Sequence, residues 1–246
     1  VSAQAELSAE RCGVLAIGQA GENLVRFANI ASGDRFLGRG GFGAVLGSKN
    51  LKAVVAHGGD YRIGPVDQKA FDRLKEKATT YIDRNAFTAR RYRKFGTPAN
   101  LSLCLRGGVL PVKNFTDGVH SHALQISGEE TERTCNTRHH TCKPCTILCG
   151  KKGTFGGRDL PAPEYETVAL LGSNLGVFDM DTIAEWNRIC GAMGMDTISA
   201  GGTLAWVMEA AERGLVQSPL KFGSPQGVSV ALMDMAELKG FGRDMA

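Results

Sequence analysis

Apolar and polar positions follow different patterns on the two sides of residue 60. Up to that point, short apolar runs are separated by glycine-rich turns. The run CGVLAIG at residues 12–18 predicts a buried strand that ends at a glycine, and the runs at residues 24–31 and 51–58 predict two more strands. The first part of the chain therefore reads as sheet and tight turns.

Beyond residue 60, apolar positions recur at helical spacing. A helix is expected to begin after Asp67, which is suited to an N-cap. The helix would present one apolar face made of Phe71, Leu74, Ala78 and Ile82.

Three more helices are expected toward the end of the chain. The first covers residues 181–194 and ends at Gly194, a residue type suited to a C-cap. The next covers residues 199–214, and the last covers residues 224–240, with Ser224 and Pro225 as N-cap and first helical residue. The apolar face of the first of these helices would consist of Ile183, Trp186, Ile189, Cys190 and Met193.

These patterns predict an α+β fold in two parts. Residues 1–60 would be the C-terminal part of a β domain, and residues 61–246 would form a mainly helical, incomplete domain that contains the clustered cysteines. The first strand has few sheet partners nearby in sequence, and the last residues read as the start of a further helix. We therefore expect the chain to be a piece of a longer protein.

Composition narrows the functional classes. Of the 246 residues, 43% are hydrophobic and 22% charged, without the run of about 20 apolar residues that a membrane span needs. A net charge of +4 without a dense Lys/Arg block argues against nucleic acid as a partner. The most basic stretch, residues 88–94, is expected to be a solvated helix face or an anion contact.

Seven cysteines without a secretory signal indicate a reducing compartment, so we expect a cytoplasmic protein.

Residues 38–47 are rich in glycine, and Arg35 and Arg39 lie beside them. Glycine lets backbone N–H groups point at an anion, and arginine can donate two hydrogen bonds to a phosphate. The stretch predicts a cradle for a phosphate or a phosphorylated cofactor, although tight turns with surface arginines would look the same. The familiar phosphate-binding motifs do not match, because the spacing differs and a strand is expected to follow instead of a helix.

Three cysteines, Cys142, Cys145 and Cys149, fall within eight residues in the spacing C-x2-C-x3-C. Zinc usually takes its ligands as two pairs, whereas an iron–sulfur cluster often combines three local thiolates with a distant fourth. The spacing therefore favours an iron–sulfur cluster. On the residues alone, the fourth ligand could lie in missing sequence or be one of Cys135, His139, His140 and Cys190.

Carboxylates offer candidates for proton transfer. Glu164 and Glu166 precede an apolar stretch, and either could transfer a proton near a buried site or simply cap a helix or face solvent. Asp196 follows the expected C-cap at Gly194 and could cap the next helix.

Six stretches together resemble the aldehyde ferredoxin oxidoreductase family of tungsten or molybdenum enzymes. They occur in the family's order and cover nearly the whole chain: IGQAGENLVRFANI, GRGGFGAVLGSKNLKAV, LPVKNFTDG, CKPCTILC, PEYETVALLGSNLGV and MGMDTISAGGTLAW. The resemblance implies oxidation of a small aldehyde to a carboxylic acid at a metal held by two molybdopterins. Electrons would pass through a [4Fe–4S] cluster to ferredoxin or a similar acceptor. The chain would carry the end of a β base domain and much of the second of three domains.

The resemblance also implies roles for single residues. Cys142, Cys145 and Cys149 match three cluster ligands, and the fourth would lie beyond Ala246. Glu166 matches a carboxylate near the metal. The residues that match pterin contacts are Arg35, Phe36, Gly38, Arg39, Met195 and Asp196.

The chain departs from the family pattern at two positions. Gly191 stands where the pterin motif D-x-x-G-L-[CD] begins with aspartate, so one hydrogen bond to the pterin should be missing or supplied by water. Some members bridge a dimer with iron held by E-x-x-H, but here Arg188 follows Glu185 and could pair with it. We expect no such iron, so a homodimer would form without it.

Two rival hypotheses remain open. The chain could be a truncated or split subunit with a structural cluster or zinc site and no activity alone. It could also be part of an acyl-CoA reductase of the same family.

Overall fold

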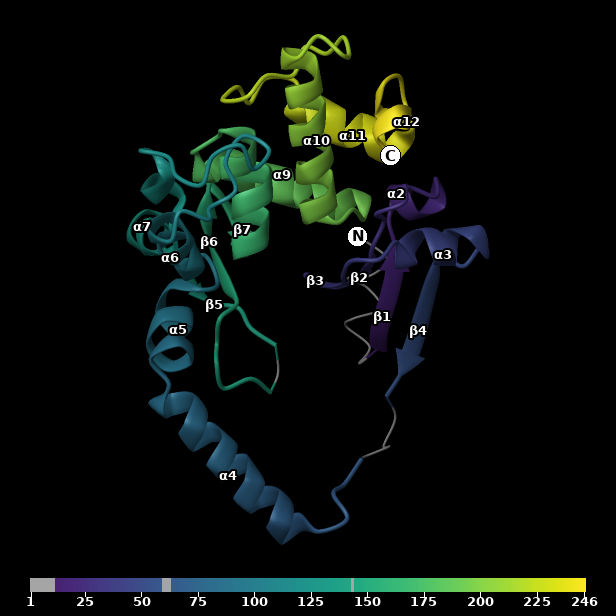
Figure 1. The fold of residues 1–246 in the computed structure, drawn as a ribbon. Coiled ribbons are helices and arrows are strands. Elements are labelled where there is room, and N and C mark those ends of the chain that lie inside the picture. Colours follow the sequence, from purple (N-terminus) through teal and green to yellow (C-terminus); the bar gives the residue numbers. More distant parts are fainter. Residues whose placement is uncertain (1–11, 59–62, 143) are drawn as a thin grey trace.

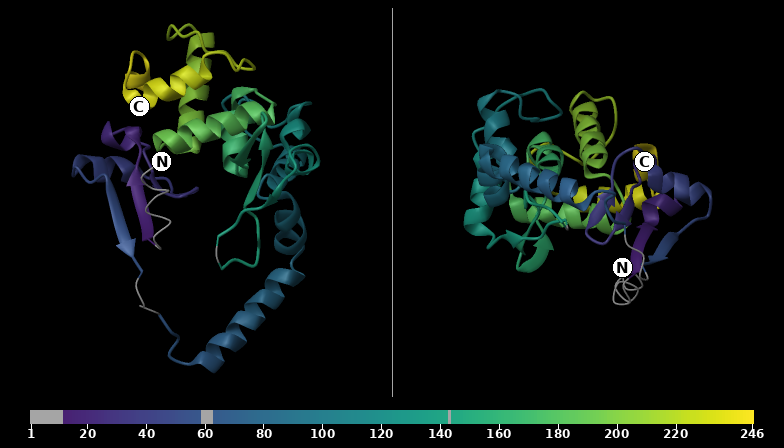
Figure 2. Two further views of the ribbon diagram at one scale, coloured as in Figure 1. Left: turned by 180° about the vertical axis from the view of Figure 1, so that it is seen from behind. Right: turned by 90° about the horizontal axis from the view of Figure 1, so that it is seen from below.

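The computed structural model describes residues 12–58, 63–142 and 144–246. It confirms the α+β prediction, with one four-stranded sheet, one three-stranded sheet and numerous helices (Figure 1). The two sheets lie on opposite sides of the described structure, with helices α9 and α10 near one end and the long helix α4 at the other (Figures 1 and 2).

The first sheet contains four antiparallel strands in the order β3-β2-β1-β4. Their bounds are β1 (Cys12–Ile17), β2 (Ile30–Ser32), β3 (Arg35–Leu37) and β4 (Ala53–His57). The strands predicted at residues 12–18 and 51–58 are therefore confirmed. The order places β3, which carries Arg35 and Phe36, at an edge of the sheet, on the side of the helical part (Figure 1).

The strand predicted over residues 24–31 is wrong over most of its length, because β2 begins only at Ile30. The residues before it form turns and one isolated bridge, and Leu24 takes the left-handed conformation at φ 61°. Val25 N donates to Ala20 O, which ties this turn to the preceding helix. Val25 and Ala28 therefore enter the core from turns instead of from a strand.

The glycine-rich stretch also differs from the prediction, because the helix α3 (Phe42–Ser48) follows the first glycines and precedes β4. It packs against the short helix α2 (Gln19–Glu22). A Cβ atom at Gly47 would lie 1.9 Å from the carbonyl oxygen of Gly21, and one at Gly43 would lie 2.4 Å from that of Asn29. At these two positions glycine allows backbones to touch, which explains part of the glycine content without an anion.

Helix α4 (Gln68–Arg84) begins where predicted, and Asp67 Oδ1 accepts a hydrogen bond from Ala70 N at 2.9 Å. Its predicted apolar face is not buried, since Phe71 is 48% and Leu74 is 66% exposed. Helical spacing thus predicted the helix correctly, although no described residues bury the apolar face of α4.

A second antiparallel sheet, in the order β5-β6-β7, carries the cysteines on the loop between its first two strands. Its strands are β5 (Arg138–His139), β6 (Lys151–Phe155) and β7 (Arg158–Pro161). Short helical segments surround it: η1 (Ala86–Tyr92), α5 (Arg93–Phe95), α6 (Ala99–Arg106), η2 (Ala123–Ile126), α7 (Gly128–Thr134), α8 (Tyr165–Thr167), η3 (Val168–Gly172) and η4 (Ser173–Leu175).

Four helices complete the chain: α9 (Met180–Met193), α10 (Thr197–Glu212), α11 (Val228–Glu237) and α12 (Gly242–Met245). The predicted face of α9 is confirmed, because Ile183, Trp186, Ile189 and Cys190 are buried. These helices share a core with Ala20, Val25 and Ala28 of the first part. The division into domains at residue 60 stays a prediction.

The start of α11 differs from the prediction. The helix begins at Val228 with Gly227 as a left-handed N-cap, and Ser224 instead closes a turn by accepting from Gln226 N. Gly194, at φ 76°, is the C-cap of α9 as predicted. In the described part of the chain, no helix combines the length and the apolar character that a membrane crossing requires.

Replacing Gly47 by alanine should destabilise the protein by about 1–3 kcal/mol, because the new methyl group would overlap the Gly21 carbonyl. Gly38→Ala is the matched control, since no atom lies within 4 Å of a Cβ built there. Urea denaturation of both variants measures the difference. Equal midpoints for the two variants would contradict the packing role of Gly47.

Candidate active site

A cavity of about 360 Å³ lies between the first sheet, the second sheet and the helices α9 and α10. Its wall comes from segments that are far apart in sequence. Six of the predicted site residues line it: Arg35, Phe36, Gly38, Glu166, Met195 and Asp196.

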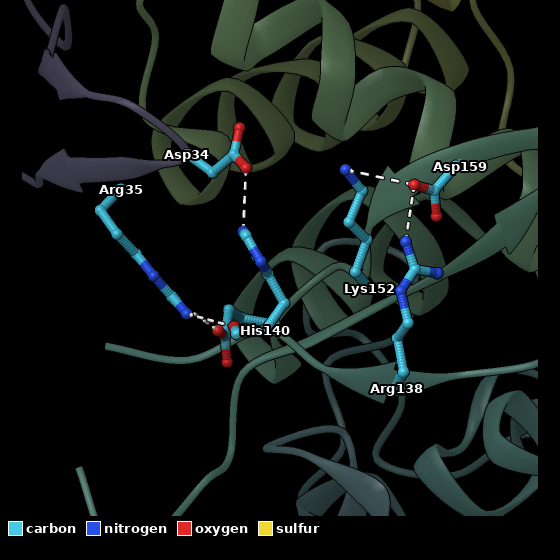
Figure 3. Close-up of polar contacts among 7 residues, drawn as sticks. Asp34, Arg35, Arg138, His140, Lys152 and Asp159 are labelled. Carbon is cyan, nitrogen blue, oxygen red and sulfur yellow. Dashed lines mark hydrogen bonds and ion pairs between the residues drawn. The ribbon is translucent and has the colours of Figure 1, made fainter. Parts of the chain in front are cut away.

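Arg35 connects the first sheet to the cysteine-bearing segment. Its Nη1 lies 3.3 Å from Glu164 Oε1, and its Nη2 donates to the carbonyl oxygen of His140 at 2.9 Å (Figure 3). A Cβ atom at Gly150 would lie 2.3 Å from Nη2 of Arg35. Glycine at that position therefore permits the guanidinium to approach the backbone at the end of the cysteine loop.

Glu164 is held from its other side by Thr97. The Thr97 hydroxyl donates to Glu164 Oε2 and accepts a hydrogen bond from Tyr165 N at 3.0 Å. Both carboxylate oxygens of Glu164 are thus engaged. Glu166, which is exposed, makes no hydrogen bond or ion pair within the described chain, so it is the freer of the two carboxylates.

A second contact joins the two sheets beside Arg35. Asp34 Oδ2 lies 2.9 Å from Nε2 of His140 (Figure 3). Within the second sheet, Asp159 binds Arg138 at 2.7 Å and Lys152 at 3.3 Å (Figure 3). These ion pairs fix the strands that flank the cysteine loop.

Asp196 is largely occupied by other groups. Its Oδ2 accepts from Arg39 Nε at 3.1 Å, from Ser199 N at 3.0 Å and from Ser199 Oγ at 2.6 Å. The expectation that Asp196 caps the next helix is confirmed. Arg39 lies outside the cavity wall but is positioned next to it by this carboxylate.

Asn29 contributes an unpaired buried acceptor. The residue is 4% exposed and lines the cavity, and its Oδ1 accepts no hydrogen bond within the described chain. Leaving a buried acceptor unpaired costs about 1–3 kcal/mol. Asn29 therefore carries an unpaired acceptor inside the protein, at a residue that borders the cavity.

The cysteine loop lies next to this cavity. Cys149 lines a small hollow that shares Lys151 and Glu164 with the cavity wall. Backbone N–H groups, first that of Leu148, stabilise the thiolate of Cys145 and lower its pKa, whereas burial raises the pKa of Cys149. Cys142 is exposed.

The basic stretch at residues 88–94 contacts the loop directly. Arg93 Nη2 donates to Thr146 O at 2.7 Å and pairs with Asp83 at 2.6 Å, while Arg91 pairs with Glu129 at 2.7 Å. Both arginines therefore bind neighbouring groups of the chain, Arg91 in partly buried contacts and Arg93 in exposed ones, so a purely solvated helix face does not describe them.

Cys135 and Cys190 belong to the two hydrophobic cores. Burial raises the pKa of Cys190 to about 12 and also raises that of Cys135, as expected of structural thiols. Among the described residues, which omit Lys143 of the loop, no three His, Cys, Asp or Glu side chains converge as metal ligands. In the described part of the chain, the thiols of the loop are therefore not gathered into a metal-binding group.

Two family models match the chain. One, described as the N-terminal domain of aldehyde ferredoxin oxidoreductase, matches residues 2–58, and one described as its domains 2 and 3 matches residues 73–246. The chain belongs to the aldehyde ferredoxin oxidoreductase family. The resemblance seen in the six sequence stretches is confirmed.

Individual relatives are similar along the whole chain. Tungsten-containing aldehyde ferredoxin oxidoreductases from Pyrococcus furiosus and Thermococcus kodakarensis are 36% and 34% identical, each over 98% of this chain and 41% of the relative. The WOR-like subunit of an aliphatic sulfonate oxidoreductase from Pyrococcus furiosus is 31% identical over 94% of this chain and 38% of its own length. The chain thus spans about two fifths of the curated relatives that it matches.

A solved structure shares the fold. The active-site complex BamBC of benzoyl coenzyme A reductase with 1,5-dienoyl-CoA matches at a TM-score of 0.75, over 99% of this chain and 39% of that chain. The sequence identity is 22%, so the match concerns architecture.

The family pattern accounts for part of the cavity wall. Sequence reasoning did not find Asn29, Asp34 or Thr97, because their partners are distant in sequence and no motif marks them. Gly191, the departure from the family motif, lies on the same wall. A Cβ atom at Gly191 would lie 3.2 Å from Cζ of Phe36, so the aromatic ring occupies the space beside it.

The second departure forms the pair that the sequence predicted. Arg188 donates to Glu185 twice, at 2.9 and 2.8 Å, and Arg158 contacts the same carboxylate. These hydrogen bonds, first that of Arg188, lower the pKa of Glu185 to about 2. The Glu185 carboxylate is thus bound by two arginines, Arg158 and Arg188.

Replacing Glu185 by glutamine should lower the free energy of unfolding by about 1 kcal/mol near neutral pH. The effect is small because Glu185 and both arginines are partly exposed, so solvent screens the ion pairs. The folded pKa lies below the ordinary 4.5, so the ionised carboxylate stabilises the fold above that pH and loses this effect as the pH falls through about 2. Urea denaturation at several pH values should show the difference between wild type and Glu185→Gln shrinking toward acid. A gap that stays constant with pH would contradict the ion-pair account.

Proposed function

We propose that the chain supplies cofactor-binding and catalytic residues of a tungsten- or molybdenum-dependent oxidoreductase that oxidises a small aldehyde to a carboxylic acid. Electrons would leave through a [4Fe–4S] cluster to ferredoxin or a similar carrier. We also propose a cytoplasmic location. Any homodimer would form without iron at Glu185, whose oxygens already bind two arginines.

The convergence of six predicted residues in one cavity carries this proposal. They come from three separate segments: residues 35–38, residue 166 and residues 195–196. Such a gathering of residues that match one family's cofactor contacts supports a shared binding site more strongly than any of the motifs alone.

The cavity suits a phosphorylated pterin. Arg35 brings positive charge to the wall, Arg39 lies beside it, and Gly38 leaves the backbone accessible. A metal held by two pterins supplies two-electron redox chemistry when bound.

Glu166 is the residue proposed to accept a proton. Conversion of an aldehyde and water to a carboxylic acid releases two electrons and two protons. The carboxylate of Glu166 lines the cavity and is free of partners in the described chain, whereas Glu164 is bound by Arg35 and Thr97. We therefore assign Glu166 to proton transfer and Glu164 to positioning Arg35.

The cysteine loop would hold the cluster. Three thiols match the donor type of an iron–sulfur site, and the lowered pKa of Cys145 favours the thiolate that binds iron. The shared wall at Glu164 and Lys151 brings the loop next to the cavity, as electron transfer requires. A structural zinc site would use the same thiols, so metal content separates the two proposals.

Cys145→Ser should remove most of the iron and the broad visible absorption of the cluster from protein purified without oxygen. Cys104→Ser is the control, because Cys104 lies on α6, outside the loop. Metal analysis of the wild type should find iron with tungsten or molybdenum. Zinc as the sole metal in the wild type would contradict the redox proposal. An unchanged iron content in Cys145→Ser would show that Cys145 is not a cluster ligand.

Glu166→Gln should lower kcat for aldehyde oxidation by about 10²-fold or more, since a positioned base is lost, while pterin and metal content stay unchanged. A viologen dye can accept the electrons in this assay. Glu212→Gln, at the exposed end of α10, is the control and should retain activity. Wild-type kcat in Glu166→Gln would exclude its role in proton transfer.

A further inference from the structure

We infer that a groove along helix α10 binds the apolar group of the substrate, and that the preferred substrate is therefore an aldehyde that carries an aromatic ring. The groove has a volume of about 490 Å³ and lies beside the cavity described above. Its walls carry two exposed aromatic side chains, Phe115 and Trp206. The inference rests on the proposed function, because it assumes that aldehyde oxidation takes place in the cavity.

The groove adjoins the cavity at the start of α10. Ile198 lines both, and Arg39, which lines the groove, is bound to Asp196 of the cavity wall at 3.1 Å. From Ile198 the groove follows α10 through Gly202 to Trp206, and residues four apart lie on the same face of a helix. Eight residues of helix span about 12 Å. A molecule whose reacting group lies in the cavity can thus extend its other end along the groove.

Gly202 keeps the middle of the groove open. Glycine inside a helix is less stable than alanine, so its presence there usually has a reason in packing or function. The neighbouring Gly201 has a packing reason, because a Cβ atom there would lie 2.5 Å from the carbonyl oxygen of Leu170. At Gly202, no described atom lies within 4 Å of such a Cβ. Packing in the described structure therefore does not require glycine at position 202, where the missing side chain leaves the groove free.

A strained backbone segment holds Phe115 at the groove. Lys113, Asn114 and Phe115 have φ angles of 45°, 53° and 62°, and this left-handed conformation is unfavourable for lysine and phenylalanine. The buried Asn174 fixes the segment, since its backbone carbonyl accepts from Asn114 N at 3.1 Å and its Oδ1 accepts from Phe115 N at 3.2 Å. Asn114 Nδ2 also donates to Glu209 Oε2 on α10 at 2.5 Å. Backbone strain that the surroundings enforce in this way is typical of binding sites.

The strain does not serve to bury the ring of Phe115. Phe115 is 64% exposed, and Trp206 is 60% exposed. Together with Leu170 and Ile198, these two side chains give the groove a mainly apolar wall. Small-molecule sites are typically apolar with few polar groups, and aromatic rings pack favourably against other rings in offset or edge-on arrangements. The groove therefore suits the ring of an aromatic aldehyde better than it suits a short, polar one.

Two matched aldehydes test the inference in the full-length holoenzyme: 3-phenylpropanal, and propanal, which has the same reactive end without the ring. Phe115→Ala and Trp206→Ala should each raise KM for 3-phenylpropanal about fivefold and leave KM for propanal within about twofold, because only the ring loses a contact. Phe71→Ala is the control, since it removes an exposed ring from α4, at the other end of the structure (Figure 1). Equal changes for the two aldehydes, or no change for either, would overturn the inference.

Filling the groove gives a second, independent test. Gly202→Leu adds a side chain where the described structure has free space, and it should lower kcat/KM for 3-phenylpropanal about tenfold while sparing propanal. Gly202→Ala adds only a methyl group and should keep the wild-type kinetics with both aldehydes. Melting temperatures reveal whether another part of the full-length protein fills the groove instead. A Gly202→Leu variant that melts well below Gly202→Ala but keeps wild-type kinetics would assign the groove to packing and overturn the inference.

The wild-type measurement separates the proposed function from the role of the groove. Wild-type protein that contains iron with tungsten or molybdenum but oxidises neither aldehyde would refute the proposed function itself. Wild-type protein that oxidises both aldehydes, together with groove variants that do not discriminate between them, would refute the role of the groove alone.

Discussion

A backbone seam between residues 27–29 and residues 194–196 determines the rest of the site. Asn29 N donates to Gly194 O at 2.8 Å, and Asp196 N donates to Phe27 O at 3.0 Å. The seam also brings Gly194 against Gly18, where a Cβ at Gly18 would lie 2.3 Å from the Met193 carbonyl oxygen. The first sheet and the helices α9 and α10 are thereby joined by backbone contacts that tolerate almost no side chain.

With this seam in place, the cavity follows from side chains that reach across from both parts. Arg35 binds Glu164 and the carbonyl oxygen of His140, and Arg39 binds Asp196. Arg35 therefore serves the junction with the second sheet and Arg39 the junction with α10, in addition to their proposed contacts with the cofactor. This double use accounts for carboxylates at the border of a cavity that we propose to take anionic groups, because the carboxylates hold the arginines in place.

The sequence predicted features that depend on local chemistry. Helical spacing and capping residues located α4, α9 and α10, and Gly194 was correctly expected to end α9. Sequence reasoning was incomplete where contacts between distant segments decide. Of the glycines in the predicted anion cradle, Gly43 and Gly47 are packing sites in α3, and helix α4 leaves its apolar face exposed. Similarly, the family motif pointed to Arg35 and Asp196, but Asn29 and Thr97 are recognisable only from the burial and partners that the fold gives them.

Anomalous diffraction from crystals of the full-length protein, purified without oxygen, tests the central claim most directly. The account predicts a tungsten or molybdenum peak inside the cavity bordered by Arg35, Glu166 and Asp196, and an iron peak at Cys142, Cys145 and Cys149. A heavy-metal peak elsewhere, or a zinc peak alone at the cysteines, would contradict it.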